Sequence, residues 1–324
     1  MSTEAVATPG AAETKRRQRR FEVRDLGIVL AFAALFVALS LSTDTFLTQR
    51  NLLNILDQSA PLGIIACAIT ICIVAGIFDV STGAIFAVSA VVATKVANSA
   101  DPYIGLMAGV LAGLGLGILN GILVHYTRIN SFIGTLATSI VYRGIAILVT
   151  GGMIVTVTDE AFSTLGTEEL IEAKYSVWVF AAFFAFTAFL LARTTFGRYV
   201  YAVGGNPEAA RRSGVRVGLV LGACYALSGF AAGVAGVLAA SRTSSAQADL
   251  GMGLELAAIA AAVVGGTSIL GGEGAVWRGV LGVLTLAIIG NGFDLLSINT
   301  TYQQLVQGVL ILLAVAVDQL VRRR

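Results

Sequence analysis

Polar side chains interrupt the long apolar runs of this sequence at four stretches, which are the candidates for chemistry. The first stretch is GIFDVSTGA, residues 76–84, where Asp79, Ser81 and Thr82 stand between two glycines. The Asp79 carboxylate could cap the following helix by accepting from its free N–H groups. It could equally line a gate or pathway, because ionisable residues in apolar segments are costly and usually functional. Both roles predict a break in the chain here.

The second stretch is NSFIGTLATSIVYRG, residues 130–144. Asn130 and Ser131 can cap the helix that follows. The hydroxyl groups of this helix recur at spacings of three and four residues and so share one face: Thr135, Thr138, Ser139 and Tyr142. This face could line a sugar path or hold two helices together. Arg143 is expected to extend towards the membrane interface.

Two further stretches lie closer to the C-terminus. GGTSILGGEGAVWRG, residues 265–279, contains so many glycines that it predicts a re-entrant turn or a broken helix. Asn291 and Asp294 fall near the end of an apolar run. The candidates for a translocation pathway or gate are therefore Asp79, Ser81, Thr82, Asn130, Ser131, Thr135, Thr138, Gly265, Gly266, Thr267, Ser268 and Asn291.

The motifs of enzymes are missing from the sequence. It contains no G-x-x-x-x-G-K-[ST] phosphate loop, no nucleophile elbow and no HExxH zinc motif. Its single histidine, His125, excludes a histidine metal cluster, and Cys67, Cys72 and Cys224 lie inside apolar runs without metal spacing. We expect no cofactor in this chain, which leaves a channel, a secondary transporter or a transport subunit driven by a partner.

The elements that position these residues are membrane helices. The 324 residues are 56% hydrophobic and 12% charged, against about 25% charged in soluble domains. Apolar runs of about 17–25 residues, long enough to span a bilayer, recur along the chain. They predict an all-α polytopic membrane protein of about ten spans, near 26–42, 61–77, 82–98, 104–126, 131–149, 175–193, 217–240, 254–270, 276–294 and 302–320. Residues 45–59 predict a separate interfacial helix, and broken-helix regions are expected near 76–84 and 265–276.

Charge predicts the orientation of these spans. With the N-terminus in the cytoplasm, 16 of the 21 basic residues fall on the cytoplasmic side, three fall outside and two within spans. Residues 1–25, with the basic run KRRQRR, are then a disordered cytoplasmic arm, residues 26–321 the membrane domain, and 322–324 a cytoplasmic tail. We favour this interpretation over nucleic-acid binding. The acidic external loop 150–174 is interpreted as solvated, with a soluble partner as the alternative.

A glycine stripe marks the fourth predicted span. Glycines recur at every fourth position, at Gly105, Gly109, Gly113, Gly117 and Gly121. Small residues at this spacing let another helix backbone approach closely, which favours helix packing in lipid. The sequence GLGLG within it is not a dinucleotide loop, because no strand precedes it.

A short polar helix is predicted in the longest internal cytoplasmic loop, 194–216. In GGNPEAARRSGV, Asn206 suits the N-cap, Pro207 the first helical position and Gly214 a left-handed stop. Glu208 and the pair Arg211–Arg212 complement the helix dipole, and Ala209 and Ala210 predict a flat, small surface. Because so short a helix is marginal alone in water, we expect it to dock against a partner. A cytoplasmic ATPase would supply the energy that the chain cannot.

These motifs together resemble the permease subunits of bacterial ABC importers for monosaccharides, the ribose permease group, over about 26–322. The segments that carry the resemblance are FDVSTG at 78–83, SFIGTLATSIVYRG at 131–144, FGRYVYAVGGNPEAARRSGV at 196–215 and the run RTSSAQADLGMGLELAAIAAAVVGGTSILGGEG at 242–274. Two positions depart from the family pattern: Ile77 replaces a usual glycine and Ala257 a frequent aspartate.

The resemblance implies the ABC importer permease fold in the bacterial inner membrane. It also implies a second permease copy, cytoplasmic ATPase subunits that bind ATP and Mg, and an external sugar-binding protein. It assigns coupling to the ATPase to Asn206, Pro207, Glu208, Ala209, Ala210, Arg211, Arg212, Ser213 and Gly214. Import of a nucleoside or a branched-chain amino acid is the alternative within this class. A facilitator or ion-coupled carrier is less favoured, because Asp79, Glu255 and Asp294 all fall near span ends.

Overall fold

The computed structural model describes residues 27–299 together with residues 302, 305, 306, 308 and 309. The chain is mainly helical, and seven of the described helices are long and apolar enough to cross a membrane. They are α2 (Gln49–Val74), α3 (Thr82–Ser99), α4 (Pro102–Thr127), α5 (Ser131–Thr150), α7 (Tyr175–Arg193), α10 (Val217–Thr243) and α12 (Val276–Leu295). Two shorter apolar helices, Gly27–Ser42 and α11 (Leu254–Val264), accompany them.

The predicted spans differ from these helices at the two ends of the chain. The first predicted span corresponds to the short helix Gly27–Ser42. The predicted span 254–270 is wrong as one helix, because α11 ends at Val264. Gly266 there has a φ of +84°, and its N–H and that of Thr267 bond the carbonyls of Val263 and Ala262, which closes the helix in a left-handed turn. The arm 1–25, the span 302–320 and the tail 322–324 lie wholly or largely outside the described residues.

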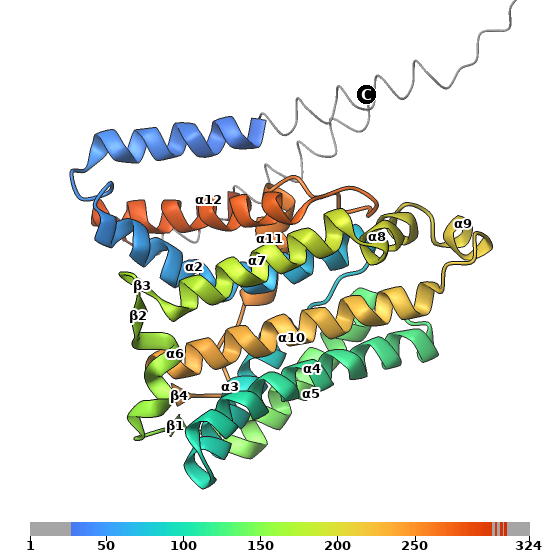
Figure 1. Cartoon of the computed structure of the whole chain (residues 1–324), viewed down its shortest axis with the longest axis horizontal. Coiled ribbons are helices and arrows are strands. Elements are labelled where there is room, and N and C mark those ends of the chain that lie inside the picture. Colours follow the sequence, from blue (N-terminus) through green and yellow to red (C-terminus); the bar gives the residue numbers. More distant parts are fainter. Residues whose placement is uncertain (1–26, 300–301, 303–304, 307, 310–324) are drawn as a thin grey trace, which may run out of the picture.

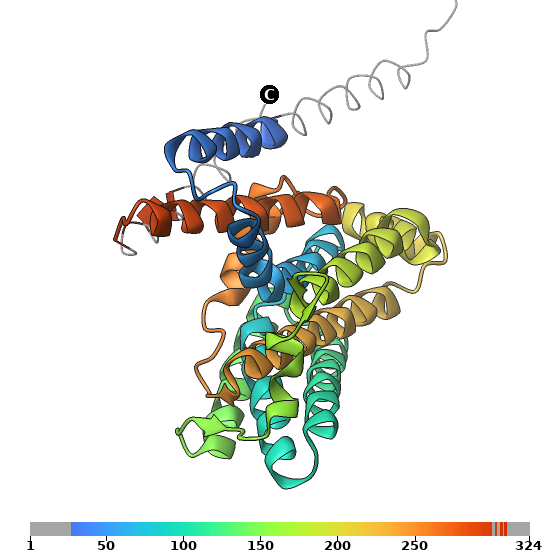
Figure 2. The same cartoon turned by 60° about the vertical axis from the view of Figure 1, so that its left-hand side comes forward.

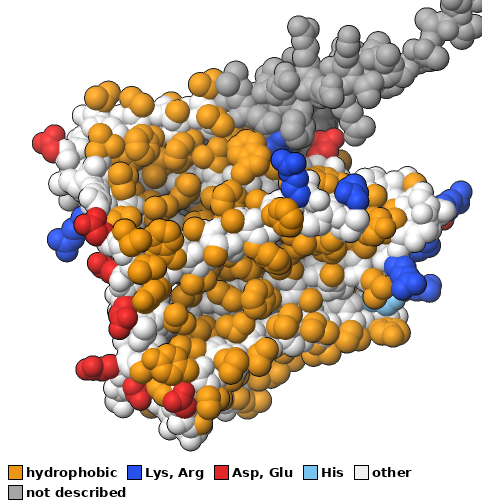
Figure 3. Space-filling view, in the orientation of Figure 1, with side chains coloured by type: hydrophobic (Ala, Val, Ile, Leu, Met, Phe, Trp, Pro, Cys, Tyr) orange, Lys and Arg blue, Asp and Glu red, His pale blue; other side chains and the backbone are white. Residues whose placement is uncertain are grey.

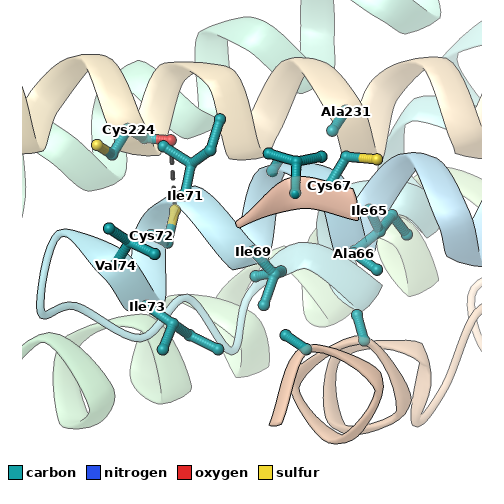
Figure 4. Packing of buried hydrophobic residues seen from close by; sticks show 14 of the residues in the cluster. Ile65, Ala66, Cys67, Ile69, Ile71, Cys72, Ile73, Val74, Cys224 and Ala231 are labelled. Carbon is teal, nitrogen blue, oxygen red and sulfur yellow. Dashed lines mark hydrogen bonds between the residues drawn. The ribbon is translucent and has the colours of Figure 1, made fainter. Parts of the chain in front are cut away.

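Helix α2 forms the centre of the protein. The separate interfacial helix predicted at 45–59 is wrong, because α2 runs without interruption from its Thr48 cap through Pro61 to Val74. Proline removes one helical hydrogen bond, but the residues after it are buried against α7, α10 and α12, and this packing maintains the helix. Figure 4 shows part of this core, where the Cys72 thiol donates to the Cys224 carbonyl at 3.5 Å. All three cysteines are free and buried, as predicted for core residues.

Helix α4 packs most extensively against α10 and then α3. The glycine stripe lies in these contacts: a Cβ at Gly113 would be 2.5 Å from the Gly233 Cα of α10, and one at Gly105 would be 2.7 Å from the Ala97 N of α3. The predicted packing role of the stripe is confirmed. Figures 1 and 2 show α4 and α5 on one side of the molecule, α12 with helix Gly27–Ser42 on the other, and α2, α3 and α10 between them.

Short elements cover the two ends of the helices. One end carries β1 (Val155–Thr156), η1 (Glu160–Ser163), α6 (Thr164–Thr167), β2 (Glu169–Leu170), β3 (Ala173–Lys174) and β4 (Ser245–Ala246), with β1 antiparallel to β4 and β2 antiparallel to β3. The other end carries α8 (Thr195–Gly205) and α9 (Pro207–Arg212). In Figure 3, acidic side chains gather at the first end and basic side chains mostly at the second.

A buried carboxylate ties the acidic end together, and sequence reasoning missed it. Asp57 of α2 is only 3% exposed and accepts from Lys174 Nζ at 2.9 Å and from the Ser176 hydroxyl. Arg242 Nη2 lies 3.6 Å from the same carboxylate. These contacts join α2, α7 and α10, because a buried carboxylate is stable only when it is paired and hydrogen-bonded.

Candidate functional site

The predicted break between the second and third spans is present at residues 75–81, which form no helix. Gly76 has a φ of +82°, and its N–H bonds the Ile73 carbonyl at 2.9 Å. The Ile77 N–H bonds the Cys72 carbonyl at 3.0 Å. These bonds satisfy the last carbonyls of α2 by a left-handed cap, so the chain can turn away while buried.

Asp79 is fully buried in this break but does not cap α3. Its Oδ1 accepts from the Ser81 N–H at 3.0 Å and from the Ser81 hydroxyl at 2.6 Å. Ser81 itself is the N-cap of α3, without a side-chain capping bond. The predicted capping role is therefore wrong. The carboxylate bonds the residue two positions on, in an aspartate turn, and this bond holds it inside the protein.

A buried polar chain continues from Ser81 across two further helices. Asn120 Nδ2 of α4 donates to the Ser81 hydroxyl at 2.7 Å, and the Tyr142 hydroxyl of α5 donates to Asn120 Oδ1 at 2.8 Å. Sequence reasoning missed Asn120, although an amide inside the apolar run 104–126 was the signal for it. Thr82, the third predicted residue of the first stretch, is also buried here.

Helix α5 supplies hydrogen bonds to the backbone of the break. Asn130 caps α5, as predicted, by accepting from the N–H groups of Phe132 and Ile133 at 2.9 and 3.4 Å. In addition, Ser131 Oγ accepts from the Phe78 N–H at 3.3 Å and Thr135 Oγ1 accepts from the Val80 N–H at 3.0 Å. Irregular backbone that is buried needs such hydrogen-bond partners, and because α5 supplies them, the first two predicted stretches form one structure.

The other hydroxyl groups of α5 have different roles. The predicted common face is confirmed, because Thr135 and Tyr142 are both buried, and Thr138 and Ser139 are half-buried between them. Thr138 donates only to the Thr135 carbonyl of its own helix, at 3.1 Å.

A third irregular segment, residues 247–253, was not predicted. It leads from β4 to α11, and Ala248 in it is buried. Arg143 Nη1 donates to the carbonyls of Ala248 at 2.6 Å and Leu250 at 3.0 Å. The expectation that Arg143 extends to the interface is wrong: its guanidinium replaces the hydrogen bonds that a helix would have provided.

The predicted break near 265–276 is a non-helical loop, residues 265–275, between α11 and α12. Thr267 and Ser268 are buried at its start, and a Cβ on Gly265 would overlap the Arg278 carbonyl. The loop turns back on itself through the Ser268 N–H, which bonds the Glu273 carbonyl at 3.0 Å. It then reaches α2, where the Gly272 N–H donates to the Val74 carbonyl at 2.8 Å.

Asn291 lies apart from the other predicted residues. Its side-chain amide and that of Asn51 in α2 exchange hydrogen bonds of 3.0 and 2.8 Å. It also lines a cavity of about 220 Å³ between α2, α11 and α12, together with Asp294 and Ala257. The four predicted stretches are therefore not one site: three of them meet near the end of α2, and the fourth joins the opposite end of that helix.

The short polar helix is present as α9. Asn206 caps it by accepting from the Ala209 N–H at 2.9 Å, and Gly214 ends it with a φ of +86°. Glu208 pairs with Arg211 and Arg212 at 3.4 and 3.2 Å. Because these ion pairs are exposed, they add little stability. Their charges are also accessible to a partner.

The predicted flat alanine surface of α9 is only half right. Ala210 is buried against the protein, whereas Ala209 is exposed. The burial of Ala210 fixes which face of α9 can meet a partner: the face that carries Glu208, Ala209 and Arg212, all exposed.

Comparison with known proteins identifies the class of this chain. The family described as "Branched-chain amino acid transport system / permease component" matches residues 51–315. The chain is 39% identical to the L-arabinose ABC transporter permease protein of Azospirillum brasilense, over 90% of this chain and 87% of that protein. It is 37% identical to the ribose import permease protein of Bacillus subtilis, over 95% and 97% of the two chains. Identity to the ribose import permease protein of Escherichia coli K12 is 35%, over 90% and 92%.

No solved structure matches the chain. The family match over residues 51–315 nevertheless includes every stretch of the candidate site described above. The chain therefore belongs to this family of transport permease components, and its resemblance to the sugar permeases of ABC importers is confirmed.

Proposed function

We propose that this chain is the membrane permease subunit of an ATP-driven importer that carries a monosaccharide, of the ribose or arabinose type, into the cytoplasm. Its relatives are arabinose and ribose permeases, which supports a sugar rather than a nucleoside or a branched-chain amino acid. The observation that carries the proposal is α9, a capped, charged helix held at the basic end of a bundle of apolar helices.

The arrangement of the importer follows from this proposal. Two permease copies would form the pathway, cytoplasmic ATPase subunits would bind ATP and Mg, and an external sugar-binding protein would deliver the substrate. The basic end with α8 and α9 would face the cytoplasm and the acidic end the exterior, in a bacterial inner membrane. The bundle would have about ten spans, with the breaks at 75–81 and 265–275 at membrane depth, inside a permease domain of 26–321.

The proposal gives the predicted residues their roles. Residues 206–214, within the coupling loop 194–216, would receive the motion of the ATPase. The three stretches near the end of α2 would form the gate: Asp79, Ser81, Thr82, Asn130, Ser131, Thr135, Thr138, Gly265, Gly266, Thr267 and Ser268. Asn291 would line the pathway at the opposite end of α2. Hydroxyl, amide and carboxyl groups of this kind can exchange hydrogen bonds with a sugar as it passes.

The test is reconstitution of the chain with its ATPase and its binding protein in lipid vesicles. We expect ATP-dependent uptake of a labelled pentose or hexose, and no uptake by the chain alone. Removing both arginines of α9, Arg211→Ala with Arg212→Ala, should lower uptake about tenfold, because paired charges at the centre of an interface dominate its energy. The matched control is Arg193→Ala with Arg198→Ala, which removes two exposed charges from the same basic end of the bundle. It should change uptake by less than about twofold.

Other outcomes would contradict the proposal in distinct ways. Uptake by the chain without any ATPase would indicate a facilitator. Uptake of labelled leucine or adenosine in place of every sugar offered would indicate another solute. Equal effects of the two arginine pairs would remove the coupling role of α9.

A further inference from the structure

Helix α9 has a direct backbone connection to the interior through α8. The N-cap of α9, Asn206, is also the C-cap of α8. The last turn of α8 ends in Gly204 and Gly205, and Gly204 lies against α2. A Cβ on Gly204 would overlap the Val74 carbonyl oxygen and come within 2.7 Å of the Gly272 nitrogen.

Three chain segments meet at this point, and each contributes glycine. A Cβ on Gly271 would lie 2.8 Å from the Gly204 carbonyl oxygen and 3.0 Å from the Gly76 Cα. A Cβ on Gly272 would lie 2.9 Å from the Gly205 Cα. The backbones of α8, of the α2 end and of the loop 265–275 therefore touch without side chains between them. We call Gly76, Gly204, Gly271 and Gly272 the glycine joint.

Hydrogen bonds hold the joint together. The Gly272 N–H donates to the Val74 carbonyl at 2.8 Å, and the Tyr201 hydroxyl of α8 donates to the Gly274 carbonyl at 2.7 Å. Burial raises the pKa of Tyr201, so this hydroxyl keeps its proton. One of these bonds ties the loop to α2 and the other ties the loop to α8.

The physical consequence is that a displacement of α8 cannot be absorbed at the joint. Side chains at an interface can change rotamer, whereas close-packed backbone moves only as a unit. Gly76 leads within three residues to Asp79, and Gly271 and Gly272 lie in the loop that joins α11 to α12. A movement of α9 would thus reach both proposed gate regions together.

We propose that the glycine joint transmits the motion of α9 to the break at 75–81 and to the loop 265–275, with Gly204 as its central positioning residue. This inference rests on the proposed ATP-driven transport. It goes beyond that proposal by stating the route through which movement of α9 opens the gate.

Adjacent glycines of α8 provide the experiment. Gly204→Ala should force α8 away from Val74, whereas a Cβ on Gly205 meets no atom within 4 Å, so Gly205→Ala is a matched control in the same turn. Each variant is purified in the complete complex with ATPase and binding protein. ATP hydrolysis and labelled sugar uptake are measured in the same vesicles, per folded complex, and expressed as sugar transported per ATP hydrolysed.

We expect Gly204→Ala to retain ATP hydrolysis while the sugar transported per ATP falls about tenfold. Gly205→Ala should keep the wild-type ratio. A second pair acts without changing the backbone: Tyr201→Phe removes one hydrogen bond of the joint and should lower the ratio about threefold. Tyr199→Phe, on an exposed position of the same helix, should leave it unchanged.

Each remaining outcome overturns the inference. A wild-type ratio in Gly204→Ala would do so, as would equal loss of hydrolysis and uptake, which indicates a merely structural role. If Gly204→Ala yields no folded complex, a wild-type ratio in Tyr201→Phe decides against the joint. These results are separate from failure of the proposed function, in which the wild-type complex itself shows no ATP-dependent sugar uptake.

Discussion

Glycine brings backbones together at the α4–α10 interface and again at the glycine joint, and these two regions differ in geometry. Along α4 the glycines are helical and recur every fourth residue over five positions, so they lie on one long face. In the joint, Gly76, Gly271 and Gly272 have φ values of +82°, +82° and +71°. The first arrangement extends a regular packing surface, whereas the second lets the chain turn at a point.

The difference indicates different roles. The α4–α10 contact continues from Gly109 to Gly121, so its parts support one another and the two helices form a rigid pair. The joint is a single crossing of three segments, held by the two hydrogen bonds described above. We therefore expect substitutions in the α4 stripe to affect folding and substitutions at the joint to affect function.

The largest expected effect tests the rigid pair. Gly117→Ala would place a Cβ over the Tyr225 carbonyl oxygen and 2.8 Å from the Gly229 Cα, so α4 and α10 must separate. We expect the free energy of unfolding to fall by about 3 kcal/mol, seen as a lower midpoint in thermal unfolding of the detergent-solubilised protein.

The control for this substitution lies two residues away. A Cβ on Gly115 meets no atom within 4 Å. Gly115→Ala should leave stability unchanged or raise it by up to about 1 kcal/mol, because alanine favours helix. Equal unfolding midpoints for the two variants would contradict the structural role of the α4 stripe, and with it the distinction between the two glycine regions.

A smaller effect is expected where irregular chain is held by a side chain. Arg143→Met keeps the length of the side chain but removes the donors to the Ala248 and Leu250 carbonyls. We expect about 2 kcal/mol lower stability, since buried carbonyls lose their partners, and earlier proteolysis within 247–253. Arg143→Lys keeps one charged donor and should recover part of the loss. Unchanged proteolysis in the Met variant would show that the segment holds itself in place.

The smallest effect concerns the break that leads from the joint. Thr135→Val removes the acceptor for the Val80 N–H and should lower stability by about 1 kcal/mol. Thr138→Val is the matched control, because that hydroxyl bonds only its own helix. Chemical denaturation of the two variants measures the difference. A larger loss in the Thr138 variant would refute the assignment of α5 as the support of the break.

The helices and their ends could be predicted from sequence where the cause is local. A run of apolar residues, an Asn206 cap or a Gly214 stop acts through residues within one or two turns. The glycine stripe of α4 likewise shows one face of one helix, so its packing role was predictable. The predictions of a separate helix at 45–59 and of a single span at 254–270 were wrong. Tertiary packing keeps α2 continuous past Pro61, and a left-handed turn ends α11 at Val264.

The composition of the site was only partly predictable, because only its local features can be recognised in the sequence. The break at 75–81 and the polar face of α5 follow from residue types. Residue types do not reveal that Ser131 and Thr135 bond the backbone of that break. Nor do they reveal that Asn120 joins Ser81 to Tyr142. The partner of a polar side chain lies tens of residues away, and many partners are chemically equivalent.

The sequence by itself determined that this chain is a bundle of membrane helices with a charged, capped helix between two spans, because apolar length, capping and charge act over short segments. Only the tertiary structure decided that Gly76, Gly204 and Gly271 meet. Glycine has no side chain by which a distant partner could be recognised, so backbone contact at glycine appears only when the helices that carry it are packed.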